Sequence, residues 1–153
     1  MLPKFRAWDK NNAYMECTDK NLTVVFAQEG IQVVDHTTFS SSCTNMEDYV
    51  LMQSTGLKDK NDKEIFEGDI LSVSKNHNKT DSRVFNDEKV NYRVEFLNYD
   101  DMEAYADIEH YGWCATGSID KWSTRCTLID AVKLWDAEIM GNKFEHPHLL
   151  EEE

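Results

Sequence analysis

The stretch "LMQSTGLKDKNDKEIFEGDIL", residues Leu51–Leu71, alternates apolar segments with two compact polar ones. In the first polar segment, Asn61 is suited to the left-handed backbone conformation that a tight hairpin needs. In the second, Glu67–Asp69, Gly68 can supply a positive φ and Asp69 can cap the turn. The stretch therefore predicts two consecutive corners that lead into a β-strand.

Two kinds of binding loop are alternatives for this stretch, and both fail. An EF-hand calcium loop that begins at Asp59 requires an oxygen ligand, a glycine and a glutamate at its fifth, sixth and twelfth positions. This chain has Lys63, Glu64 and Ile70 there. A phosphate-binding loop fails because the glycines of the stretch lie too far apart and have the wrong neighbours. The pattern favours a structural role.

The remainder of the chain is dominated by short β-rich runs separated by turn residues. Strands are expected over 3–9 and 13–17 as one hairpin, 21–28 and 30–35 as another, and over 49–55, 67–74 and 89–98. Residues 103–117 are expected to pair with the strand at 89–98. Thr127 and Asp130 resemble the start of a short helix, 137–142 resembles a final strand, and Pro147 suits the first position of a terminal helical turn. The fold class is therefore mainly β (a β-rich α+β fold), with barrel or roll closure.

The polar segment 36–45 separates the first two hairpins from the rest of the chain. We place a domain boundary there. The predicted organisation is an N-terminal β-hairpin lobe over 1–45 and a larger β body over 46–153, and the two could form one compact unit.

Composition narrows the classes of function. The formal net charge of −13 argues against a protein that grips phosphate backbones. The acidity serves solubility, or it marks an acidic surface that mimics nucleic acid. No apolar run approaches the ~20 residues of a membrane span, and the N-terminus lacks the apolar core of a signal peptide. A cytoplasmic protein with free thiols is expected, since the four cysteines form no C-x-x-C pair.

Few side chains are candidates for reactive groups, and a structural role is a simpler explanation for each of them. His146 and His148 with a cysteine could bind zinc, but an H-x-H pair at a chain end without paired cysteines is more typical of a solvated tail. Cys114 would need a histidine such as His110 close in space to act as a nucleophile, and a buried thiol on a strand is the commoner outcome. A carboxylate cluster is the remaining candidate, and it comprises Asp100, Asp101, Glu103, Asp107 and Glu109. No catalytic residue, metal site or cofactor is predicted.

Three segments in order resemble the YopX-like proteins of bacteriophages and prophages. They are "PKFRAWDKNNAYM", the stretch Leu51–Leu71, and "EIMGNKFEHPHLL". The resemblance implies a phage or prophage origin in a bacterial host, an SH3-like barrel in the C-terminal part and self-association, and it brings no catalytic residues. The family's middle block usually has Asn-Gly where this chain has Asn61-Asp62. Its closing block usually has Asn-Pro-Glu where this chain has His146-Pro147-His148.

The residues that carry the resemblance are candidates for a structural or interface role. They are Arg6, Trp8, Gln53, Gly56, Asp59, Asn61, Glu67, Gly68, Asp69, Gly141, Asn142 and Pro147. The favoured function is a non-enzymatic, oligomeric accessory protein that binds a host or phage protein, without a nucleic-acid or membrane partner. The alternatives are an acidic mimic that occupies a nucleic-acid-binding protein, and a metal-dependent nucleotide hydrolase that uses the carboxylate cluster.

Overall fold

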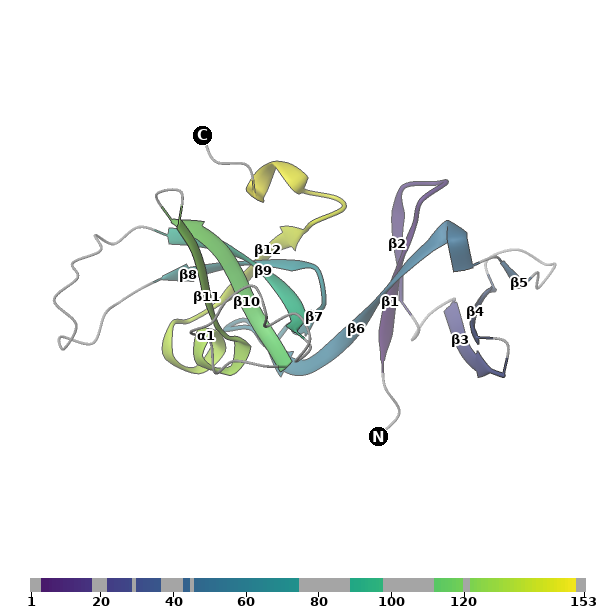
Figure 1. The fold of residues 1–153 in the computed structure, drawn as a ribbon, viewed down its shortest axis with the longest axis horizontal. Helices are drawn as coiled ribbons and strands as arrows, with labels where there is room; N and C mark the ends of the chain where they lie inside the picture. The colour runs from purple at the N-terminus through teal and green to yellow at the C-terminus, as the bar shows by residue number, and fades with distance from the viewer. Residues whose placement is uncertain are drawn as a thin grey trace, which may run out of the picture. The chain divides into compact units, whose positions relative to one another are not determined.

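The computed structural model describes residues 4–17, 22–28, 30–36, 43–44, 46–74, 89–97, 112–119 and 122–150 (Figure 1). The chain divides into two compact units, Met1–Ser54 and Thr55–Glu153. The long strand β6 (Tyr49–Lys58) contains the boundary between them. The expected boundary at residues 45 and 46 therefore differs from the observed one. The reason is strand pairing, because the first half of β6 pairs with β1 (Phe5–Asp9).

The N-terminal unit is built from antiparallel pairs. The hairpin of β1 and β2 (Tyr14–Cys17) lies beside β6. A second, three-stranded sheet contains β3 (Leu22–Ala27), β4 (Gly30–Asp35) and β5 (Cys43–Thr44), and a single 3-10 turn η1 (Met46–Asp48) precedes β6. Both predicted hairpins are confirmed.

A small apolar core holds the N-terminal unit together. Ala7, Val33 and Tyr49 are buried, and Val24 and Leu51 pack against them. Ala7 and Leu51 are register partners on β1 and β6, whereas Val24 and Val33 are partners on β3 and β4. The core therefore forms where one face of the β3–β4 hairpin packs on one face of the β1–β6 pair.

The C-terminal unit contains an antiparallel sheet in the strand order β11-β10-β9-β8-β12, in which β8 to β11 form a meander and β12 pairs with β8. Figure 1 shows β8 to β11 side by side, with α1 at one end of them. The elements after β6 are β7 (Glu64–Phe66), β8 (Asp69–Ser74), β9 (Lys89–Leu97), β10 (Gly112–Ile119), β11 (Trp122–Thr127), α1 (Leu128–Leu134), β12 (Glu138–Asn142) and the 3-10 turn η3 (Pro147–Leu150).

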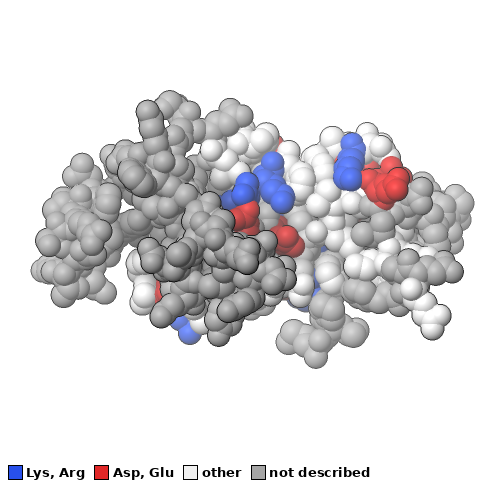
Figure 2. Space-filling model, viewed as in Figure 1, with Lys and Arg blue, Asp and Glu red and all other residues white. Residues whose placement is uncertain are grey.

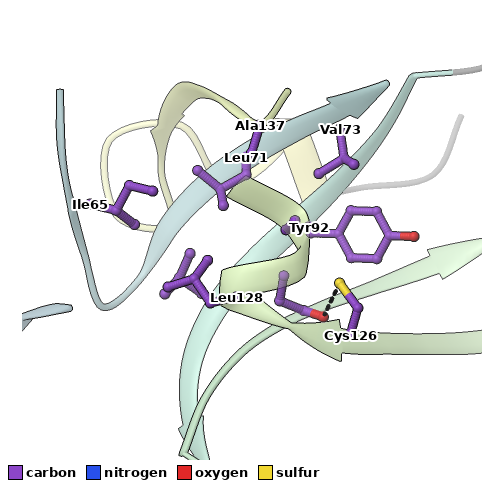
Figure 3. Close-up of a cluster of buried hydrophobic side chains, with 10 residues drawn as sticks. Ile65, Leu71, Val73, Tyr92, Cys126, Leu128 and Ala137 are labelled. Carbon is purple, nitrogen blue, oxygen red and sulfur yellow. Dashed lines mark hydrogen bonds between the residues drawn. The ribbon is translucent and has the colours of Figure 1, made fainter. Parts of the chain in front are cut away.

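One face of this meander forms the main core. Tyr92 and Val94 on β9 are buried, and they lie opposite Gly117 and Ala115 on β10. Helix α1 covers this face with Leu128 and Ala131. Figure 3 shows Ile65, Leu71, Val73, Tyr92, Cys126, Leu128 and Ala137 around this core, with the Cys126 thiol directed to the Ala115 carbonyl.

The start of α1 follows the predicted capping pattern. The Thr127 hydroxyl oxygen accepts the backbone N–H of Asp130 at 3.2 Å, and the same hydroxyl donates to the Asp130 carboxylate at 2.6 Å. These bonds satisfy a helix N–H that would otherwise lack an intrahelical partner. The mainly β fold class, the short helix, the final strand and the terminal helical turn at Pro147 are confirmed, whereas closure as an SH3-like barrel stays a prediction.

Candidate functional site

The turn at Asp59 is organised by the carboxylate of that residue. Asp59 is buried at 6% exposure. Its Oδ1 accepts the backbone N–H of Asn61 at 2.8 Å and that of Lys63 at 2.9 Å. The backbone closes the same turn, because the Asp62 N–H donates to the Asp59 carbonyl at 3.0 Å. A single side chain thus accepts hydrogen bonds from two residues of this hairpin loop.

The same carboxylate also binds a distant part of the chain. Oδ2 of Asp59 accepts the backbone N–H of Ile139, on β12, at 3.0 Å. The Lys60 N–H donates to the Ala137 carbonyl at 2.9 Å, and the Lys60 ammonium forms an ion pair with Glu138. The middle and closing motif blocks, which are remote in sequence, therefore meet at Asp59.

The environment of Asp59 favours its ionised form. Burial alone would raise the pKa of this carboxyl, but the backbone N–H groups of Ile139, Lys63 and Asn61 outweigh burial and lower the pKa below its usual value. Asp9 in the N-terminal unit behaves in the same way: burial raises its pKa, but hydrogen bonds from Asn12, Asn11 and Tyr49 together lower it below the usual value. Both groups act as charged acceptors for their own turns.

These lowered pKa values predict a loss of stability in acid. A folded-state pKa below the unfolded value means that the unfolded chain binds protons first as the pH falls. The stabilisation by Asp9 and Asp59 is therefore present above about pH 4 and is lost as the pH falls through the folded-state pKa values. Urea unfolding midpoints at a series of pH values should show this decline, and the Asp59→Asn variant should show a weaker one. An equal decline in that variant would contradict the role of Asp59.

The second corner joins the strands on either side of it. Gly68 has φ +77°, and Oδ2 of Asp69 accepts the Phe66 N–H at 2.9 Å, so the predicted corner is confirmed. The Gly68 N–H donates to the Val94 carbonyl, and its carbonyl accepts the Lys143 N–H, each at 2.9 Å. The corner thereby links β9 to the chain that leaves β12.

The closing block folds back on itself beside β12. Oδ1 of Asn142 accepts the N–H groups of Phe144 and Glu145, each at 3.0 Å. The His146 ring lies against Gly141, where an added Cβ would be 2.6 Å from its Nδ1. The side-chain amide of Asn91, on β9, donates to the Leu149 carbonyl at 2.9 Å. The expected solvated tail is thus wrong, because His146 is half-buried and this segment packs on the sheet.

The N-terminal motif residues lie in the other unit. Arg6 and Trp8 are half-buried on β1, and the Arg6 guanidinium donates to the Met52 sulfur at 3.7 Å. Gln53 is exposed on β6. Gly56 lies further along β6, already in the C-terminal unit, and has φ +73° and no atom within 4 Å of the position of an added Cβ. The remaining candidates, Glu67 and Pro147, lie at the second corner and at the start of η3.

The left-handed residue of the first turn is Asp62, with φ +64°, and the expectation for Asn61 is wrong. The Asn61 N–H points at the Asp59 carboxylate, which places the backbone reversal one residue later. Asp62 is therefore the residue of this turn that adopts the left-handed conformation. Its carboxylate contacts the Lys58 ammonium at 2.8 Å, and both side chains are largely exposed.

Replacing Asp62 with glycine should stabilise the protein by about 0.5 kcal/mol. Relief of the left-handed conformation gains up to about 1 kcal/mol, and loss of an exposed ion pair costs only a few tenths. Asp62→Ala is the matched control and should destabilise, because alanine loses the local hydrogen bonding that helps Asp tolerate this conformation. Urea denaturation measures both changes, and a less stable glycine variant would refute the account of the turn.

The other candidates for reactive groups are either buried or outside the described residues. Cys114 is completely buried on β10, as expected for a structural cysteine. His110 and the carboxylate cluster 100–109 lie outside the described residues, as does the side chain of Cys43. Within the described part of the chain, no group of three or more His, Cys, Asp or Glu side chains could hold a metal ion, and no helix could cross a membrane.

The sequence profile of the family described as YopX protein matches residues 4–151. The chain belongs to the YopX family. Two solved structures resemble it over nearly their whole length. Protein EF1440 from Enterococcus faecalis is 25% identical with a TM-score of 0.60, and each chain is covered to 99%. Protein yopX from Bacillus subtilis is 16% identical with a TM-score of 0.60, with 100% of this chain and 99% of that chain covered. A comparison with curated proteins found no match.

The N-terminal segment of the YopX-family motif contains a further buried acceptor, Asp9, which is not among the residues predicted from the sequence. It lies at 3% exposure, and its Oδ1 accepts the Asn11 and Asn12 N–H groups at 2.8 and 2.9 Å. The signal was present in the sequence, because Asp9-Lys10-Asn11 repeats as Asp59-Lys60-Asn61. Both copies form a turn around the first residue.

Proposed function

We propose that this YopX-family protein is a non-enzymatic, self-associating accessory protein of a bacteriophage or prophage, which binds a protein partner in the cytoplasm of the bacterial host. The main support for the non-enzymatic role is the set of contacts that the motif residues of the C-terminal unit make. Asp59, Asp69 and Asn142 are buried and accept backbone N–H groups of their own turns. Groups used in this way serve the scaffold, whereas a reaction centre needs polar groups directed at a substrate.

The surface that we propose for association comprises exposed apolar side chains of the same unit. Phe96 is 49% exposed and packs edge-on against Trp113, with ring centroids 5.0 Å apart. Leu134 on α1 is 61% exposed, and Met140 on β12 is 49% exposed. Aromatic residues and methionine are enriched at protein interfaces. We propose that a second copy of the chain covers part of this surface.

The acidic-mimic alternative has less support. Basic and acidic side chains lie next to one another on the described part of the face in Figure 2. Lys58 contacts Asp62, and Arg93 forms an ion pair with Glu95. A mimic of nucleic acid requires a row of uncompensated negative charges, and these pairs interrupt such a row.

Sedimentation velocity of the full chain over a wide concentration range tests self-association. We expect a mass above the 17.8 kDa of one chain. At least one of the variants Phe96→Lys, Leu134→Lys and Met140→Lys should lower that mass, because a charge buried in an apolar contact is costly. Lys133→Gln is the matched control, since it changes an exposed neighbour of Leu134 without adding charge to the apolar surface. A single species of 17.8 kDa at every concentration would rule out the assembly.

A further inference from the structure

We draw no further inference here: the strongest candidate, the closing segment from Lys143 to Leu150 that packs beside β12 and β9, belongs to the site already described, and nothing in the structure points to a second arrangement or to a ligand that would release it.

Discussion

Replacing Asp59 with alanine is expected to lower the free energy of unfolding by about 3 kcal/mol. The substitution removes a buried charged acceptor from three backbone donors, the N–H groups of Asn61, Lys63 and Ile139. Hydrogen bonds to charged groups contribute about 1.5–3 kcal/mol each, but solvent can reach part of the opened turn, so the three losses do not add fully. Urea or thermal unfolding of the purified variant measures the change.

Two conservative variants separate the role of Asp59 from general disturbance of the turn. Asp59→Asn keeps an oxygen for the Asn61 and Lys63 N–H groups but turns an amide NH₂ toward Ile139, and it should cost about 1–2 kcal/mol. Asp62→Asn changes the same side-chain type in the same turn, and it should stay within about 0.5 kcal/mol of the wild type because its ion pair is exposed. Equal losses in the two variants would argue against a special role for Asp59.

The substitution Gly117→Ala is expected to destabilise the C-terminal unit by about 2–3 kcal/mol. An added Cβ would lie 2.8 Å from the Asn91 carbonyl oxygen and 2.9 Å from the Tyr92 ring. Asn91 belongs to the paired strand β9, and Tyr92 is buried at 2% exposure, so neither group can move without disturbing the core. Glycine at this position lets the tyrosine ring lie over the neighbouring strand.

Two comparisons make the Gly117 prediction specific. Gly56→Ala adds a Cβ where nothing lies within 4 Å. Its only cost is the positive φ, which should lower the free energy of unfolding by about 1 kcal/mol. In a Tyr92→Leu background, Gly117→Ala should cost less than in the wild type, because the clash with the ring is removed while the clash with the Asn91 carbonyl stays. A cost below about 0.5 kcal/mol in the wild type would show that the two strands separate easily.

Local patterns in the sequence were sufficient to predict elements whose cause is also local. The β-rich run at 89–98 predicted β9, Thr127 marked the start of α1, and Gly68 marked the second corner. Each of these follows from a few neighbouring residues. The prediction that Asn61 is the left-handed residue was wrong, because the position of the reversal depends on the hydrogen bonds that the Asp59 carboxylate makes.

Pairing between distant segments does not follow from local patterns in the sequence. Strand β7 spans three residues, and β11 is largely polar, so neither has a clear hydrophobic period. The boundary between the two units follows Ser54, and not residue 45, because β6 pairs with β1, which is distant in the sequence. The bond from Ile139 to Asp59 uses a backbone N–H, which leaves no trace in the sequence of β12. The motif can therefore be recognised in the sequence, but the contacts between its blocks can be seen only in the structure.

The most direct test of the central claim is amide hydrogen exchange at Ile139. The claim is that the two motif blocks of the C-terminal unit are structural parts joined through the Asp59 carboxylate, which accepts the Ile139 N–H at 3.0 Å. In Asp59→Asn, we expect the Ile139 amide to exchange about tenfold faster relative to amides at the centre of β9, which corresponds to about 1.4 kcal/mol. An unchanged ratio in a folded variant would contradict the claim.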